Sequence, residues 1–334
     1  MKKLINNPDN VVNEMFEGFL LANKNKVKRI GEINAAARKN VPIKDKVGIL
    51  IGGGSGHEPM FLELIGKGMA DVVVIGDVFA APPSTAILEA TKAANSGKGV
   101  LYIYNNYMGD NLNFGMASDL AQMEGINVET VRVWDDVASA PLDRIEERRG
   151  IAGVLFIIKI AAAIAETGAD LQKVKSTAEE ARDNIRSIGV ALTSATIPST
   201  GKTTFNIAED EMEIGMGLHG EPGVKRVKLV AAKETAVTMS EQILQDLPFE
   251  KGDEVSVLVN GLGSTTRMEL LIMYNELDKI LKEKQIKVYD VEIGSYCTTQ
   301  EMAGCSFTLM KLNDKLKELY KNKADSPGYR FCGK

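Results

Sequence analysis

The chain is poor in residue types that often build cross-linked or metal-binding sites. Among 334 residues there are two histidines, three cysteines and one tryptophan. The cysteines Cys297, Cys305 and Cys332 form neither an even set nor a CxxC pair, so no disulfide framework is expected. A reducing cytoplasm is the simplest setting for them. No close cluster of Cys, His and carboxylate residues indicates a metal site.

Excess positive charge and long apolar runs are also lacking. The net charge of −5 and the pI near 5.4 exclude a broad basic field that would follow nucleic-acid phosphates. Residues 1–7 contain no apolar signal core. The most apolar helical stretch, residues 151–165, is interrupted by Lys159 and is too short to span a bilayer. We therefore expect neither a nucleic-acid partner nor a membrane partner.

Apolar runs alternate with amphipathic helical stretches along most of the chain, and this alternation predicts an α/β fold. In the first half, the expected strands are 47–51, 72–75, 99–104 and 128–133, and the expected helices are 11–23, 59–67, 84–95 and 112–124. Two helices, 151–166 and 171–188, follow. In the second half, the expected strands are 190–192, 255–258, 287–293 and 307–312, and the expected helices are 236–244, 267–283 and 314–321.

These elements predict two α/β domains, each a mixed sheet flanked by helices. We expect residues 1–185 to form the first domain and residues 186–334 the second. Two polar, glycine-containing loops, 52–56 and 105–110, follow strands of the first domain. Open α/β sheets place their ligands at the carboxyl ends of strands, so both loops are candidates for a binding site.

Both histidines lie in glycine-rich loops of similar chemistry: GHEP at 56–59 and LHGEPG at 218–223. Glycine permits close approach of a ligand, and proline stiffens the chain that follows. A histidine on such a loop can present a ring nitrogen to a ligand. Alternatively, His57 and His219 are structural residues that bond to the backbone. The residues alone leave both interpretations open.

A third loop, YNNYMGDN at 104–111, contains Asp110 at the expected start of a helix. Asp110 is either an N-cap or early-turn acid, or a general base that takes a proton from a substrate hydroxyl. The spacing does not separate these alternatives.

Two segments resemble nucleotide-binding motifs but fail their requirements. TGKTT at 200–204 looks like the end of a phosphate loop, yet Thr196 stands where that motif needs a glycine. The glycines at 52–56 fail the dinucleotide pattern, because His57 follows them and no acidic residue ends a clear second strand. We expect no nucleotide site on this chain.

Several of these segments resemble the K-subunit family of the dihydroxyacetone kinases. The matching segments are GGGSGHEP at 52–59, GKGM at 66–69, NY at 106–107, GD at 109–110, RRGIAG at 148–153, EMEIGMGLHGEPG at 211–223 and LVNGLG at 258–263. The likeness extends from the first residues to about Leu312. The histidine motifs are long and specific.

The resemblance implies a role for each candidate residue. A ring nitrogen of His219 adds to the ketone carbon of a small ketose and forms a hemiaminal, which positions the substrate covalently. His57 hydrogen-bonds the substrate and helps to move a proton. Asp110 takes the proton from the hydroxyl that attacks phosphorus. Backbone groups of three residues line the pocket: Gly54, Ser55 and Gly56.

The resemblance also implies partners, because the phosphoryl donor must come from a second protein. This is a helical L-type subunit that carries ADP or ATP with magnesium. In many bacteria that nucleotide is recharged by a phosphoenolpyruvate phosphotransferase chain. The resemblance further implies a homodimer. In-line transfer requires the partner to cover the Asp110 pocket.

Some positions depart from the family's usual pattern. Asn105 stands where a lysine would contact the ketose, and Phe61 and the loop AAPPS at 80–84 also differ. Asparagine offers a donor and an acceptor without charge. We therefore keep open a different ketose, with a tetrulose such as erythrulose as the leading candidate. A second alternative is a paralogue that senses the ketose and regulates transcription through a partner. The presence of Asp110 favours the enzyme, and Asn105 weakens that argument.

Overall fold

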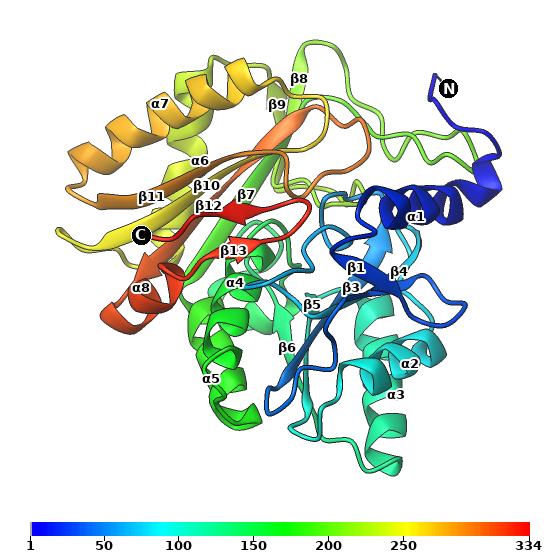
Figure 1. Ribbon diagram of the computed structural model, residues 1–334. Coiled ribbons are helices and arrows are strands. Elements are labelled where there is room, and N and C mark those ends of the chain that lie inside the picture. Colours follow the sequence, from blue (N-terminus) through cyan, green and yellow to red (C-terminus); the bar gives the residue numbers. More distant parts are fainter. Residues whose placement is uncertain (1) are drawn as a thin grey trace.

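The apolar runs of the first half assemble into a six-stranded sheet with the order β1-β2-β4-β3-β5-β6 (Figure 1). The computed structural model describes residues 2–334. Strands β3 to β6 are parallel, and β1 and β2 pair antiparallel at one edge. The strands are β1 (Val27–Arg29), β2 (Ala35–Arg38), β3 (Gly48–Ser55), β4 (Val72–Val78), β5 (Val100–Asn105) and β6 (Val128–Val133).

Helices cover both faces of this sheet. Helices α2 (Ser84–Ala94) and α3 (Met108–Met123) share a hydrophobic cluster with residues of one face. Three helices share a cluster with residues of the other face: α1 (Val11–Ala22), α4 (Val154–Ala165) and α5 (Leu171–Asp183). Two short 3₁₀ helices, Pro8–Asn10 and Leu142–Glu147, complete this half.

The second half forms another six-stranded mixed sheet, with the order β11-β10-β12-β7-β8-β9. Only β10 and β11 are parallel to each other within it. The strands are β7 (Ile185–Ala191), β8 (Glu211–Ile214), β9 (Lys225–Lys228), β10 (Glu254–Gly261), β11 (Lys287–Gly294) and β12 (Gly304–Leu312). The helices are α6 (Ala232–Asp246), α7 (Arg267–Glu283) and α8 (Asp314–Tyr320), and a small pair β13 (Ala324–Asp325) and β14 (Arg330–Phe331) follows. The predicted α/β architecture with two mixed sheets is confirmed.

The two sheets share one hydrophobic core. Val257 and Val259 of β10 belong to the cluster that includes α6 and α7, whereas Leu258 belongs to the cluster that includes α4 and the first sheet. This alternation follows the two-residue period of a strand. Eleven of the twelve α4 side chains are buried, and α4 also packs against α8. Because one cluster spans both halves, the division into two domains at residue 185 stays a prediction.

The structure corrects three expectations about local structure. Residues 59–67 form turns and no helix: the Met60 amide donates to the carbonyls of His57 and Tyr296, each at 3.1 Å, and does not extend a helical ladder. The helix expected at 171–188 ends at Asp183, and its last residues belong to β7. Strands β1, β2, β8 and β9 were not expected, because each has only three or four residues.

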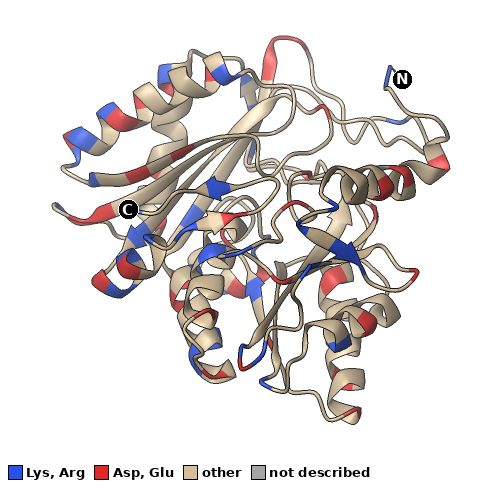
Figure 2. Ribbon diagram, in the orientation of Figure 1, with Lys and Arg blue, Asp and Glu red and all other residues tan. Residues whose placement is uncertain are grey.

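Charge is distributed in both signs over the surface helices. Helices α7 and α8 each carry both basic and acidic residues (Figure 2). Within residues 2–334, no helix combines the length and the apolar character needed to cross a membrane.

Candidate active site

The two histidines, 162 positions apart in the chain, lie side by side. His57 follows the end of β3, and His219 lies on the loop between β8 and β9. Their Nε2 atoms are 3.1 Å apart and their ring centroids are 5.0 Å apart. His57 is 2% exposed, whereas the His219 side chain is 26% exposed. The structure therefore brings together the two similar loops that the sequence marked.

His57 is fixed as a neutral ring with a known tautomer. Its Nδ1 lies 2.7 Å from the carbonyl oxygen of Thr298, which can only accept, so Nδ1 carries the proton. Burial, followed by the charge of His219, lowers the pKa of His57 to about 3. The Nε2 atom of His57 is therefore free to accept a proton or a hydrogen bond.

His219 is held by the carboxylate of Glu221, two residues further along the same loop. Its Nδ1 donates to Glu221 Oε1 at 2.9 Å, and its backbone amide donates to Glu221 Oε2 at 2.9 Å. Burial raises the pKa of Glu221, but the hydrogen bond from His219 and its charge outweigh burial and bring the pKa to about 2. The proton on Nδ1 leaves the Nε2 lone pair of His219 available as a nucleophile.

The contact between the two Nε2 atoms defines what the pair can do. Since each Nδ1 carries a proton, the two Nε2 atoms face each other across 3.1 Å with their lone pairs. A ketone placed here offers an electrophilic carbon to His219 Nε2. As the carbon–nitrogen bond forms, the ketone oxygen can take a solvent proton that His57 Nε2 relays.

Asp110 lies in the first turn of α3, directly after β5. The N-cap position is Tyr107, so Asp110 is an early-turn acid and not the cap. Its Oδ1 is buried without a hydrogen-bond partner. Burial raises the pKa of Asp110 to about 7, against the lowering effect of the charge on His219. A carboxyl poised near neutral pH is suited to general base catalysis.

The segment 105–111, from the end of β5 to the first turn of α3, concentrates unpaired buried polar atoms. Eight buried side-chain N or O atoms lack a partner in the described part of the chain, and four of them belong to residues 105–111. These are Asn105 Oδ1, Tyr107 Oη, Asp110 Oδ1 and Asn111 Oδ1. Each such atom costs about 1–3 kcal/mol when no ligand pairs it. A ligand rich in hydroxyl groups would pair them, and the Tyr107 ring, 4.7 Å from that of His219, connects this loop to the histidines.

The glycine-rich end of β3 shapes the wall beside Asp110, and most of the segment 52–56, expected as a loop, belongs to this strand. A Cβ at Gly53 would lie 2.6 Å from the Phe61 ring and 3.7 Å from Asp110 Oδ1. The Ser55 hydroxyl donates to the Gly76 carbonyl at 2.7 Å, and the Gly56 amide donates to Glu58 Oε1 at 2.9 Å. These two polar groups are engaged within the protein. The predicted lining of the pocket by the backbone of Gly54, Ser55 and Gly56 stays a prediction.

One segment after β11 hydrogen-bonds to both histidine loops, and no local sequence pattern indicates these contacts. The Thr298 carbonyl accepts from His57, and the Thr299 hydroxyl donates to the Leu218 carbonyl at 2.7 Å. The Phe79 ring lies 5.1 Å from that of His57 and 5.3 Å from that of His219. Glu221 had been noticed only as part of a motif. These contacts join residues up to 241 positions apart, which spacing alone does not reveal.

Residues 17–328 match the family model of the Dak1 domain. The chain belongs to the Dak1 family. Among curated Dak1 relatives, it is similar to the PTS-dependent dihydroxyacetone kinase 2, dihydroxyacetone-binding subunit DhaK, of Listeria innocua, with 42% identity over 331 residues and 99% of each chain covered. It is also similar to the L-erythrulose kinase of Pectobacterium atrosepticum, with 38% identity, covering 99% of this chain and 56% of that one.

Solved Dak1 structures agree with this assignment. The native dihydroxyacetone kinase of C. freundii superposes with a TM-score of 0.91 and 32% identity, covering 98% of this chain and 60% of that one. The dihydroxyacetone kinase operon co-activator Dha-DhaQ superposes with a TM-score of 0.87 and 31% identity, covering 94% of this chain and 96% of that one. The resemblance inferred from the histidine motifs is therefore confirmed.

Proposed function

We propose that this chain is the ketose-binding subunit of a dihydroxyacetone-kinase-type phosphotransferase. The observation that carries the proposal is the geometry of His219, whose Nδ1 is held by Glu221 while its Nε2 faces His57. The unpaired carboxyl of Asp110 supplies the second catalytic group. The similarity to the dihydroxyacetone-binding subunit of Listeria innocua supports the same function.

In the first step, His219 Nε2 attacks the carbonyl carbon of the ketose. The carbon–nitrogen bond forms, the π electrons of the carbonyl move to its oxygen, and that oxygen takes a proton that His57 Nε2 relays from solvent. The proton taken from solvent leaves the substituted imidazole of His219 positively charged. Glu221, which accepts from Nδ1, stabilises this charge. A compound without a carbonyl, such as glycerol, cannot form the bond.

In the second step, Asp110 takes the proton of a ketose hydroxyl while the oxygen of that hydroxyl attacks the terminal phosphorus of the ATP on the partner; the phosphorus–oxygen bond to ADP breaks, and ADP leaves with its electrons. The covalent bond to His219 holds the ketose in place during this step. Its hydroxyl is therefore oriented for attack, which a ketose bound only by hydrogen bonds would achieve less often. Asn105 and Tyr107, whose buried oxygens lack partners, would bind further hydroxyl groups of the ketose.

We place the nucleotide, ADP or ATP with magnesium, on a helical partner subunit. The purified chain with ketose and magnesium ATP is expected to transfer no phosphate until this partner is added, because neither of the two nucleotide-like segments meets its motif. A coupled assay for the ketose phosphate measures this. Phosphate transfer by the purified chain alone would contradict the assignment of the nucleotide site to the partner subunit.

An exposed apolar stripe on α3 supports docking of the partner beside Asp110. Met108, Leu112 and Met116, spaced four residues apart, are 87%, 64% and 49% exposed. Such spacing places them on one face of the helix. Helix α3 has two acidic residues and no basic one, so this face is weakly charged (Figure 2).

Leu112→Glu is therefore expected to raise the partner concentration for half-maximal transfer about 10-fold or more, since a buried charge in an interface costs over 1.4 kcal/mol. Formation of the ketose adduct should not change. The matched control is Met123→Glu, because Met123 is 83% exposed at the far end of α3, roughly 16 Å from Leu112 along the axis. If both variants respond alike, the stripe is not the docking surface.

A ketose sensor is the second candidate function, and the similarity to the Dha-DhaQ co-activator favours it. A sensor needs the bond to His219 but no base, so the buried Asp110 carboxyl favours the kinase.

The similarity to an erythrulose kinase keeps a tetrulose open as the substrate. Native mass spectrometry with dihydroxyacetone competed against each erythrulose enantiomer in a separate experiment ranks the ketoses. A homodimer, recharging by a phosphoenolpyruvate phosphotransferase chain and a cytoplasmic location remain part of the proposal.

A further inference from the structure

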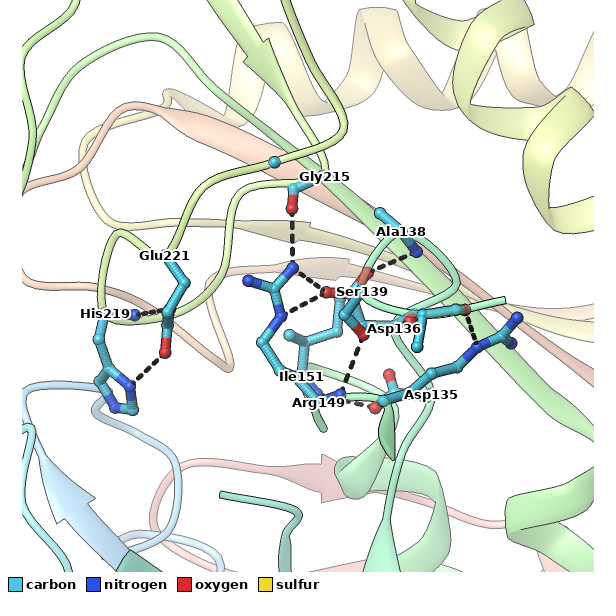
Figure 3. A network of polar contacts seen from close by, with 12 residues as sticks. Asp135, Asp136, Ala138, Ser139, Arg149, Ile151, Gly215, His219 and Glu221 are labelled. Atoms are coloured by element: carbon cyan, nitrogen blue, oxygen red, sulfur yellow. Dashed lines mark hydrogen bonds and ion pairs between the residues drawn. The ribbon is translucent and has the colours of Figure 1, made fainter. Parts of the chain in front are cut away.

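Arg149, between β6 and α4, joins the first half of the chain to the loop that carries His219 (Figure 3). Its Nε and Nη2 donate to Asp136 Oδ2 at 3.2 and 2.9 Å. The same Nη2 donates to the carbonyl oxygen of Gly215 at 3.0 Å. Gly215 begins the loop that leads to His219. The Arg149 guanidinium thus hydrogen-bonds both to an acidic side chain of the first half of the chain and to a backbone carbonyl of the second half.

The guanidinium also lies against the segment that holds Glu221. A Cβ at Gly217 would fall 2.5 Å from Arg149 Nη1 and 2.2 Å from Glu221 Oε2. Both side chains therefore pack against the one bare face of Gly217. Because Glu221 fixes the His219 ring, a displacement of Arg149 would be transmitted to the nucleophile through this loop.

The contacts that hold Arg149 to the segment 136–139 fix its position. Asp136 is fully buried, and its Oδ1 accepts from the Ala138 amide at 3.1 Å. The Arg149 amide donates to the Ser139 hydroxyl at 3.0 Å, and the Arg149 carbonyl accepts from the Asp136 amide at 3.1 Å. Backbone and side chain of Arg149 are therefore both fixed to the segment 136–139. A fork with two fixed donors suits such positioning better than a flexible ammonium group.

We propose that Arg149 is a positioning residue that sets the His219 loop relative to Asp110, through its contacts with Asp136, Gly215 and Gly217. This inference rests on the proposed function, since the distance that matters is the one between the ketose bound to His219 and the Asp110 carboxyl. Tyr107 links the two groups: its ring packs edge-on against that of His219, with the ring centroids 4.7 Å apart, and it precedes Asp110 by three residues in the chain.

The test is Arg149→Lys, which keeps the positive charge but cannot span Asp136 and Gly215 together. Adduct occupancy at saturating ketose should equal that of the wild type, because Glu221 still orients His219. The kcat for phosphoryl transfer in the presence of the partner should fall about 10- to 100-fold, the effect of misplacing reacting groups by about 1 Å. Loss of stability alone would lower adduct and kcat in the same proportion.

Arg226→Gln is the matched control. Arg226 donates to Glu213 at 2.8 Å on the β8–β9 hairpin that carries the loop, but among the described residues its side chain makes no hydrogen bond or ion pair with the segment 215–221. Its adduct occupancy and kcat should both match the wild type.

The outcomes separate this inference from the proposed function. An unchanged kcat in Arg149→Lys, or a proportional loss of adduct and kcat, overturns the positioning role. Absence of any adduct in the wild type overturns the proposed function itself. If Arg149→Lys does not fold, Asp136→Asn provides the same readout: the single amide oxygen cannot accept from both the Ala138 amide and the Arg149 guanidinium, so the guanidinium loses its fixed position and a selective loss of kcat is again expected. An unchanged kcat in that variant overturns the inference.

Discussion

Replacing His219 with alanine is expected to abolish the covalent ketose adduct and, with it, phosphoryl transfer. His57 cannot take over as nucleophile, because its ring is buried and fixed by the Thr298 carbonyl. Without the bond, the ketose is held only by hydrogen bonds to the 105–111 loop. Well-positioned groups gain effective concentrations of about 10⁵ M or more. We therefore expect transfer to fall by about 10³-fold or more.

Native mass spectrometry of the His219→Ala chain at saturating ketose measures the adduct, and the coupled assay with partner measures transfer. Thermal unfolding provides the control, since the His219 side chain is partly exposed and its removal should leave the fold intact. An adduct of wild-type occupancy in this variant would remove His219 from the nucleophile role.

Asp110→Asn is expected to separate binding from catalysis. An asparagine has nearly the same shape as the aspartate but cannot take a proton from the ketose hydroxyl. The adduct on His219 should form as in the wild type, whereas transfer should fall by about 10²- to 10⁴-fold, the usual contribution of a general base. Adduct occupancy and kcat, measured on the same preparation, report the two effects. Unchanged turnover would remove Asp110 from the base role.

The pH dependence of the wild type checks the same assignment. The pKa of Asp110 is raised to about 7 by burial, so the carboxyl is protonated and inactive below that pH. The value of kcat/KM, which reports the free protein, should therefore rise as pH increases through about 7 and then level off. This rise should be absent from the residual activity of Asp110→Asn.

The parts of the molecule that could be predicted from sequence are those set by local patterns. Strands β4 and β5 begin with continuous apolar runs, and β3 and β5 end in glycine or polar residues. Strand β6 alternates apolar and polar residues. The short edge strands were missed. Strand β2 consists of three alanines and an arginine, and β9 of charged residues around Val227, so neither shows a strand pattern.

The site was predictable as a set of residues but not as an arrangement. His57, His219 and Asp110 were found through their loops, whereas the choice between a structural and a chemical role needed distances. The structure shows that Asp110 is not the N-cap and that its Oδ1 is unpaired. The support from Thr298 and Arg149 depends on tertiary contacts between distant segments, for which the sequence contains no local signal.

The bond between His219 Nε2 and the ketose carbonyl carbon is the step on which all others depend. Nuclear magnetic resonance of the chain labelled with ¹⁵N at histidine, mixed with ketose labelled with ¹³C at the carbonyl, tests it directly. We predict a tetrahedral carbon signal that is coupled to the Nε2 nitrogen of His219. A carbon signal without coupling to any histidine nitrogen at saturating ketose would contradict the hemiaminal.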